Sequence, residues 1–204
     1  MPPVMPWTIR PVQPNDFPSL TALVADAWDL ASLCGSAADG QIFAARYLRY
    51  CLAESTFAAA ACLDRRLAGF VLARADGAAP LPLPPEENRP FAGEKARALW
   101  TSMEDYAARC DALRRSAPLP FEGELTLFIV HHTLRGRGAG TALYDAARAY
   151  FRRARVRRFF LYTDSTCTWS FYEGKHLARL GRAAMANPAD PPRPLSIFLY
   201  GGAP

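Results

Sequence analysis

The chain has 204 residues, half of them hydrophobic, and a formal net charge of +5. This length suits one domain, or one domain with an insertion, and it supplies enough apolar residues for a sizeable core. Charged residues interrupt every apolar run before it reaches the roughly 18 residues of a membrane-spanning helix, so the composition argues against a membrane span. The positive charge suits an acidic partner such as nucleic acid, a nucleotide or a phosphate-bearing cofactor, without choosing among them.

The N-terminus and the cysteines favour a cytoplasmic protein. The opening segment MPPVMPWTIRP lacks the basic region, the apolar segment and the small-residue cleavage site of a secretory signal. The five cysteines are scattered without a CxxC pair, and an odd number suits neither a disulfide framework nor a zinc site. We therefore expect reduced cysteines, most of them in the core, and no metal. They are Cys34, Cys51, Cys62, Cys110 and Cys167.

The first part of the chain predicts a short extended segment, two helices and a hairpin. Residues 7–11 read as a strand, and helical spacing of apolar residues predicts helices over 19–33 and 41–52. The segments 55–63 and 67–75 flank a charged turn at 64–66 and predict two antiparallel strands.

A proline-rich stretch then marks a boundary. Five prolines between residues 76 and 90 exclude both a helix interior and a central strand. Beyond them, residues 94–115 carry apolar residues on one face, which predicts an amphipathic helix. We interpret residues 76–119 as a helical insertion in a single domain. Its helix either packs on the core or forms a lid at a substrate entrance.

The rest of the chain alternates strands with helices. Because helices are interleaved with hairpins, we expect a mixed sheet of the α+β class rather than a purely parallel one. The expected elements are strand 122–130, helix 138–153, strand 158–163, helix 168–175 and strands 178–185 and 195–200.

A glycine-rich corner joins the strand at 122–130 to the next helix. Its sequence RGRGAGT has no lysine before the threonine, which excludes a Walker phosphate loop. The glycines alternate, and no acidic residue ends a following apolar strand at the usual distance, which argues against a dinucleotide fingerprint. The remaining pattern is Arg-x-x-Gly-x-Gly at a strand-to-helix junction, where successive amides can face a diphosphate.

This pattern resembles the pyrophosphate loop of the GNAT superfamily of acyl-CoA-dependent N-acetyltransferases, which begins five residues after a strand-ending valine, here Val130. The segment WSFYEGKHL, Trp169 to Leu177, is similar to the family's Phe-Tyr-Glu segment. The resemblance covers most of the chain, but not the insertion. It implies a GNAT-like mixed sheet, mostly antiparallel, with splayed central strands and helices on both faces.

The resemblance also implies acetyl-CoA as the cofactor and assigns the residues that bind it. Backbone groups of Phe128 and Val130 are expected to bond the pantetheine, and the Val130 amide is expected to polarise the thioester carbonyl. Ser165 stands where many members have an asparagine that contacts pantetheine, a departure from the family pattern, and the resemblance implies a cofactor contact there. The expected diphosphate-binding residues are Arg135, Gly136, Arg137, Gly138, Ala139, Gly140 and Thr141.

An amine acceptor is protonated at neutral pH, so a base must take a proton before attack, directly or through water. Strand alternation places Glu124 on the same face as Thr126, Phe128 and Val130, and its spacing before Val130 matches the family's catalytic glutamate. Glu122 shares that face and is an alternative base or a site for a cationic substrate. Either residue can also be a solvated carboxylate at a strand end.

Tyr172 stands where the family's tyrosine protonates the leaving thiolate, and the alternative is a packing aromatic. His176-Leu177 departs from the Gly-Phe that usually ends this segment. His131-His132 precedes the loop, but with no acidic cluster in the sequence around it we interpret the pair as structural.

We therefore expect an N-acetyltransferase that transfers acetyl directly from acetyl-CoA to the amine of a small molecule or peptide. The alternatives are a longer-chain or tRNA-linked acyltransferase, or a CoA-binding sensor without catalysis. The aromatic residues beside the arginine-rich segment 148–158 suit core faces as well as base stacking, so we do not expect nucleic acid as a partner. A homodimer is compatible with the sequence, which does not identify the acceptor.

Overall fold

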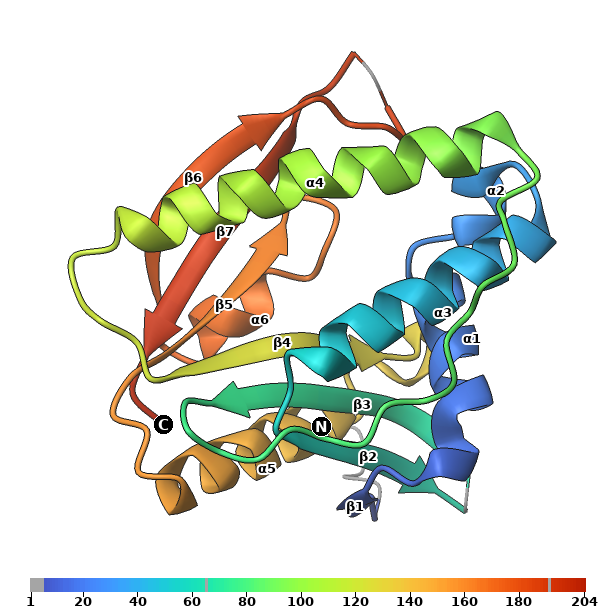
Figure 1. Cartoon of the computed structure of the whole chain (residues 1–204). Helices are drawn as coiled ribbons and strands as arrows, with labels where there is room; N and C mark the ends of the chain where they lie inside the picture. Colours follow the sequence, from blue (N-terminus) through green and yellow to red (C-terminus); the bar gives the residue numbers. More distant parts are fainter. Residues whose placement is uncertain (1–5, 65, 191) are drawn as a thin grey trace.

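The computed structural model describes residues 6–64, 66–190 and 192–204 (Figure 1). The strands are β1 (Thr8–Pro11), β2 (Phe57–Leu63), β3 (Arg66–Ala75), β4 (Gly123–Val130), β5 (Phe159–Asp164), β6 (Ala178–Met185) and β7 (Leu195–Gly202). The helices are α1 (Phe17–Ala27), α2 (Leu30–Cys34), α3 (Ala37–Ala53), α4 (Glu94–Arg115), α5 (Ala139–Arg153) and α6 (Ser170–Gly174), with short 3-10 turns η1 (Pro14–Asp16) and η2 (His132–Leu134).

All these strands form one sheet in the order β1-β2-β3-β4-β5-β7-β6. Each neighbouring pair is antiparallel except β4 and β5, which run parallel. The parallel pair exists because α5 carries the chain from the end of β4 back to the start of β5. The mixed, mostly antiparallel sheet predicted from the sequence is confirmed.

Two hydrophobic clusters cover opposite faces of the sheet. Along β3, Val71 belongs to the cluster under α5, whereas its neighbours Phe70 and Leu72 belong to the cluster under α1 and α3. Successive side chains on a strand point to opposite faces, so the helices lie on both sides. This confirms the predicted helices on both faces (Figure 1).

A β-bulge changes which face the side chains of β4 occupy. Leu72 pairs with Leu127, but the next residue of β3, Ala73, pairs with Leu125, so Thr126 is an extra residue in β4. Leu125 consequently packs under α5, whereas Leu127 packs under α1 and α3. Strict alternation would have placed both leucines on one face.

The long helix α4 has the bounds expected for the helix of the insertion. It contacts α2 and α3 near one end and β6 and β7 near the other, and Figure 1 shows it lying across the front of the sheet. Asp39 of α3 fixes its start, because the buried carboxylate accepts hydrogen bonds from the amides of Ala92 and Gly93 at 2.9 and 2.8 Å. These two bonds lower the pKa of Asp39.

Most expected elements are present, but the helix predicted over 19–33 is two helices. Asp29 adopts a left-handed conformation with φ of 47°, which ends α1 and redirects the chain into α2. Four of the five cysteines are buried and Cys167 is half-buried, which confirms that most of them lie in the core. The turns expected around 64–66 and after β6 include residues 65 and 191, which lie outside the described residues.

Candidate active site

The site is a cleft between β4 and β5. These strands pair only through Gly123 with Phe159 and Glu124 with Phe160, and they diverge beyond that point. The predicted splay of the central strands is thus confirmed, and it opens a cleft of about 620 Å³. The lining includes β4 from Leu125 to Val130, most of the glycine-rich loop, the end of β5, α6, and side chains from the α1–α2 junction, α3 and α4.

The backbone of β4 presents polar groups to this cleft. The amide of His131 donates to the carbonyl of Ala68 on β3 at 2.8 Å. Because backbone groups of alternate residues on a strand point to opposite sides, the N–H and C=O groups of Val130 and Phe128 point away from β3 and towards the gap. The Arg135 side chain confirms this direction, since its Nε donates to the carbonyl of Val130 at 3.3 Å.

The glycine-rich loop has the backbone of an anion-binding turn. Gly136 and Gly138 have φ values of 74° and 92°, a left-handed conformation that glycine adopts without strain. No backbone acceptor among the described residues is found for the amides of Gly136, Gly138, Ala139, Gly140 and Thr141. These N–H groups lie at the start of α5, where the helix dipole favours negative charge, so they fit a diphosphate.

Two neighbours hold the loop in place. Trp7 Nε1 donates to the carbonyl of Arg137 at 2.8 Å, which ties the segment before β1 to the loop. On the other side, a Cβ placed on Gly140 would lie 3.5 Å from Phe171 and 3.8 Å from Val130, so the start of α5 packs directly against the end of β4.

Lys175 is a cation near the loop that the sequence did not point to. Its Nζ donates to Thr141 Oγ1 at 3.1 Å and lies 5.4 Å from the centre of the Phe171 ring. Lys175 is therefore an additional counter-charge for an anion at the helix start. In contrast, the arginines at the C-terminal end of α5 lie about 20 Å away along the helix axis.

Glu124 is not where alternation placed it. The bulge at Thr126 puts Glu124 on the face of the sheet opposite Phe128 and Val130, so the predicted shared face is wrong. Glu124 pairs with Arg74 in the sheet and lies beside Arg114 and Asp111 of α4. It does not line the cleft itself, but its neighbours Leu125 and Thr126 do, at the closed end where β4 and β5 meet.

The surroundings of Glu124 give its carboxyl the pKa of a base that works near neutral pH. Its side chain is 19% exposed, and Arg74 Nη2 donates to Oε2 at 3.0 Å. Burial raises the pKa of Glu124 to about 7 and outweighs the lowering by Arg74. A carboxyl with such a pKa can accept a proton at neutral pH, at which an amine acceptor must lose one before it attacks.

Glu122, the alternative base, is differently placed. Its carboxylate accepts hydrogen bonds from the amide and the guanidinium of Arg157, 2.6 Å from the backbone N and 2.6 Å from Nε. These bonds lower the pKa of Glu122. The carboxylate therefore closes the turn before β5 and is a poor base.

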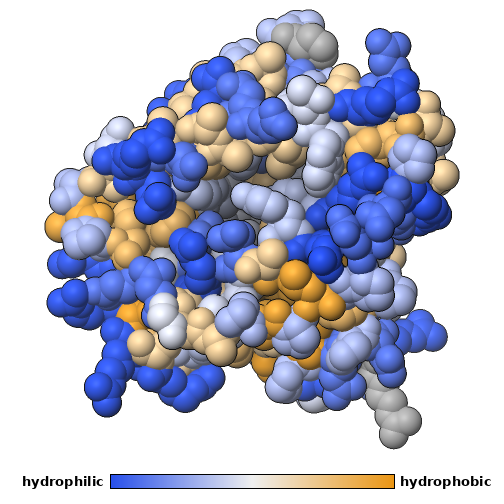
Figure 2. Space-filling view, in the orientation of Figure 1, coloured by the Kyte–Doolittle hydropathy of each residue, from blue (hydrophilic) through white to orange (hydrophobic). Residues whose placement is uncertain are grey.

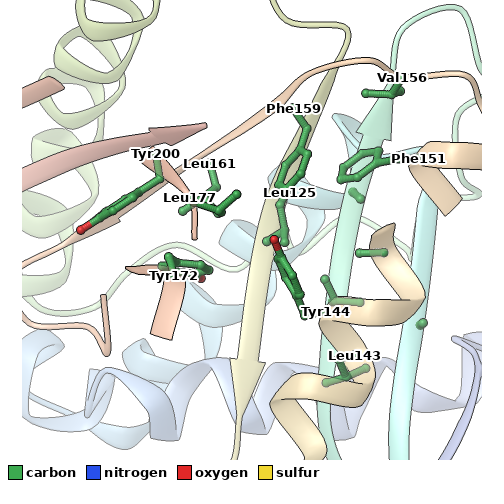
Figure 3. Packing of buried hydrophobic residues seen from close by; sticks show 14 of the residues in the cluster. Leu125, Leu143, Tyr144, Phe151, Val156, Phe159, Leu161, Tyr172, Leu177 and Tyr200 are labelled. Carbon is green, nitrogen blue, oxygen red and sulfur yellow. The ribbon is translucent and has the colours of Figure 1, made fainter. Parts of the chain in front are cut away.

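Tyr172 lies in the cleft wall, contributed by α6. Its ring is 6.0 Å from that of Tyr200, and only 9% of the residue is exposed. Figure 3 shows it between Tyr200 on one side and Leu125 and Tyr144 on the other. Burial raises the pKa of the Tyr172 phenol, so the hydroxyl stays protonated at neutral pH.

Ser165 does not line the cleft. Its Oγ accepts a hydrogen bond from the amide of Ser196 on β7 at 3.1 Å, and its own amide donates to the Ser196 carbonyl. The cleft at this level is lined by Asp164 and Thr166. Of the other predicted cofactor residues, Phe128, Val130 and the loop residues all line the cleft except Ala139, which is buried beneath the helix start.

The side of the cleft away from the loop is an aromatic wall that the sequence did not reveal. Its four members are far apart in the chain, so no local pattern identifies them. They are Trp28 after α1, Tyr47 of α3, Tyr106 of α4 and Tyr162 of β5. Figure 2 shows the surface hollowed between α4 and α3, the two helices that carry Tyr106 and Tyr47.

The histidine pair before the loop has an acidic partner that the sequence did not reveal. His132 Nδ1 lies 3.1 Å from Asp26 Oδ2 and His131 Nε2 lies 3.8 Å from the same oxygen. The three side chains place one potential metal-ligating atom each within 4.8 Å of one another. The contact connects the end of α1 to the segment leading into the loop.

Known proteins share this fold. Ribosomal-protein-alanine N-acetyltransferase from Brucella melitensis is 15% identical with a TM-score of 0.57, covering 97% of this chain and 99% of that chain. An acetyltransferase of the GNAT family from Streptococcus pneumoniae is 16% identical with a TM-score of 0.54, covering 97% and 98%. Ard1 from Thermoplasma volcanium is 12% identical with a TM-score of 0.53, covering 97% of both. No curated protein matches the chain.

The family comparison agrees with the fold and the cleft. A model of the acetyltransferase (GNAT) family matches residues 24–176, more than half of the chain. In the part of the chain that the structure describes, no helix combines the length and apolarity of a membrane span. The chain belongs to the acetyltransferase (GNAT) family, and it transfers an acetyl group from acetyl-CoA to an amine.

Proposed function

We propose that the acetyl group passes directly to the amine in the cleft between β4 and β5, with the glycine-rich loop holding the diphosphate, Glu124 acting as base and Tyr172 as acid. Acetyl-CoA supplies the acetyl group as a thioester, and the residues around it bind, orient and move protons. The observation that carries this proposal is the convergence of three features in one cleft: the amides of Gly136, Gly138, Gly140 and Thr141, which have no backbone acceptor among the described residues, the outward backbone groups of Val130, and the Tyr172 side chain.

At the phosphate end, the amides from Gly136 to Thr141 would donate to diphosphate oxygens. Each contact at a helix start contributes about 0.3 to 2 kcal/mol. Arg135 and Lys175 add positive charge beside them. This arrangement fixes the cofactor so that its thioester end lies beside Val130, where the backbone amide would polarise the carbonyl oxygen.

Glu124 would take the proton of the amine through a water molecule. A relay is required because Glu124 lies behind Leu125 and Thr126, at the closed end of the cleft. A pKa of about 7 lets the carboxyl accept a proton from that water and release it again at neutral pH.

Tyr172 would protonate the departing thiolate. Its raised pKa keeps the proton available, and a thiolate formed in the same buried cleft also has a raised affinity for protons. Among the described residues, Cys167 contributes the thiol of the cleft wall, and it is a poor nucleophile because burial raises its pKa. The protonated Tyr172 and the poorly nucleophilic Cys167 both favour direct transfer over an acetyl-cysteine intermediate.

The acceptor would be a small molecule or a peptide with a free amine, which would reach the cleft beneath α4. In this proposal α4 acts as the lid of the entrance, because Tyr106 contributes to the cleft wall while the helix ends are fixed on other elements. We place the reaction in the cytoplasm, with no role for nucleic acid, and a homodimer is compatible with it.

The test is release of CoA thiol from acetyl-CoA in the presence of a panel of amines. We expect amine-dependent release by the wild-type protein, strongly reduced in Tyr172→Phe. Binding of acetyl-CoA without release with any amine would identify a CoA sensor instead. Failure of the folded protein to bind acetyl-CoA would contradict the proposed site.

A further inference from the structure

The aromatic wall lines the side of the cleft away from the glycine-rich loop. Trp28 and Tyr47 meet edge to face, with ring centres 5.4 Å apart. Tyr162 and Tyr106 come from β5 and α4 and line the same cleft. The burial-raised pKa values of Tyr47, Tyr106 and Tyr162 show that these phenols stay neutral.

The charges in the cleft are divided between its two ends. Among the described residues that line it, the charged side chains are Arg135 and Arg137 of the loop and Asp164 at the end of β5. The cations therefore belong to the phosphate end. Among the described residues, no lysine, arginine or histidine lines the aromatic end. Arg114, which does not line the cleft, acts on Tyr162, but Glu124 and Asp111 act on it with the opposite sign, so a carboxylate on the acceptor would be buried there without a counter-charge of its own.

Among the described residues that line the cleft, Asp164 is the acidic one, and Glu124 and Asp111 add negative charge near Tyr162 without lining the cleft. Asp164 lies two residues after Tyr162 on β5, so the two side chains share a face of the strand. One carboxylate oxygen, Oδ1, accepts from the amide of Thr166 at 2.8 Å, which fixes the orientation of the group. A protonated amine approaching the cleft would be attracted both by this carboxylate and by the faces of the aromatic rings.

The Tyr162 hydroxyl adds a polar contact at the same place. It is buried and has no hydrogen-bond partner among the described residues. An unpaired buried hydroxyl is unfavourable, so a bound molecule that offers a polar atom there would satisfy it. Tyr162 lines the cleft and packs beneath α4, where the acceptor would enter.

We infer that the acceptor is an amine with an aromatic or apolar body and no carboxylate, held between the aromatic wall and Asp164. The inference rests on the proposed function, because it takes the aromatic end of the cleft as the acceptor side. It excludes free amino acids as preferred acceptors, since these carry a carboxylate next to the amine.

The test compares matched ligands that differ in charge. Titration calorimetry on the CoA-saturated protein would measure the dissociation constants of tyramine, tyrosine and tyrosinamide. We expect tyramine and tyrosinamide to bind at least about tenfold more tightly than tyrosine, a difference of about 1.4 kcal/mol. Equal or tighter binding of tyrosine, or binding of none of the three, would overturn the inference. Tyrosinamide binding as weakly as tyrosine would show that bulk, rather than charge, is excluded, which also overturns it.

Variants of Tyr106 and Asp164 test whether the amine binds between the aromatic wall and Asp164. Tyr106→Leu should weaken tyramine binding at least about fivefold, and Tyr106→Phe, which keeps the ring, should stay within about twofold of the wild type. Asp164→Asn should weaken tyramine binding, whereas Asp105→Asn on the exposed side of α4 should not. Unchanged binding in both Tyr106→Leu and Asp164→Asn would refute this location.

CoA binding in the absence of amine separates this inference from the proposed function. If CoA does not bind to the folded protein, the proposed function fails. If CoA binds and the amine preferences are absent, only the assignment of the acceptor class fails.

Discussion

Glu124 is a half-buried carboxyl whose charge is only partly balanced by Arg74. With a pKa of about 7, it is protonated below neutral pH and cannot accept a proton. We therefore predict that kcat/KM rises with pH to a plateau above about pH 7, and that Glu124→Gln lowers it roughly 10²- to 10⁴-fold. Thiol release at saturating acetyl-CoA, measured from about pH 5.5 to about pH 9, gives this pH profile.

Glu122→Gln is the matched control for this prediction. Glu122 lies on the same chain segment, but Arg157 holds its carboxylate away from the cleft. The kcat/KM of the Glu122→Gln variant should stay within about threefold of the wild type at pH 8. Loss of activity in Glu122→Gln together with full activity in Glu124→Gln would reverse the assignment of the base.

The raised pKa of Glu124 also predicts how the free energy of unfolding depends on pH. The folded protein holds the Glu124 proton up to about pH 7, whereas the unfolded chain loses it near the ordinary value of 4.5. Protonation of Glu124 therefore contributes to the free energy of unfolding in full below pH 4.5. About 3 kcal/mol of this contribution is lost as the pH rises through 7. Glu124→Gln removes this loss, so urea unfolding at pH 8 should find the variant at least as stable as the wild type. A variant much less stable at pH 8 would mean that the ionised carboxylate stabilises the fold.

Tyr172 allows a test of the proposed acid. Tyr172→Phe keeps the buried ring and removes only the proton donor, so turnover should fall roughly 10²- to 10⁴-fold while the acetyl-CoA dissociation constant hardly changes. Tyr144→Phe is the control, because Tyr144 is a buried phenol of the same hydrophobic cluster that does not line the cleft. Wild-type turnover in Tyr172→Phe would show that the tyrosine only packs.

At the scale of elements, two glycine variants separate the contribution of the loop to acetyl-CoA binding from the folding cost of backbone strain. Gly136 and Gly77 have φ values of 74° and 76°, and no atom lies within 4 Å of a Cβ added to either. Alanine at either position should cost about 1 to 2 kcal/mol of folding free energy. Only Gly136→Ala changes the direction of amides at the phosphate site, so only it should weaken acetyl-CoA binding, by at least about tenfold. Calorimetry on both variants provides the comparison, and equal affinities would contradict the role of the loop.

The bounds of several elements followed from the sequence because their signals are local. The helix at 94–115 has an unbroken apolar face after a proline-rich segment, and the structure ends it at the same residues. Two departures have causes that no local pattern reveals. Asp29 adopts a left-handed conformation within an apolar helical pattern, and Thr126 is an extra residue only relative to its partner strand β3.

At the scale of the whole molecule, the cleft separates two parts of the sheet that pair directly only at the start of β4 and β5. A cofactor bound between the strands would contact both parts in the folded state and neither in the unfolded chain. At about 100 times its dissociation constant, acetyl-CoA should increase the free energy of unfolding by about 2.7 kcal/mol. Thermal unfolding with and without acetyl-CoA measures this, and an unchanged melting temperature would contradict binding.

The glycine-rich loop and the end of β4 could be located as part of the cleft from the sequence, whereas the aromatic wall could not. The loop and the end of β4 are contiguous, so their glycine spacing and the preceding valine identify them together. Trp28, Tyr47, Tyr106 and Tyr162 converge only after four elements have packed. The hydroxyl of Ser165 turns towards β7, a direction that its position along the chain does not indicate.

A crystal structure of the CoA complex tests the central claim most directly. We predict diphosphate oxygens within about 2.7 to 3.2 Å of the amides between Gly136 and Thr141, with the sulfur beside Val130 and the Tyr172 hydroxyl. A diphosphate bound elsewhere on the molecule, with the loop amides facing solvent, would contradict the account.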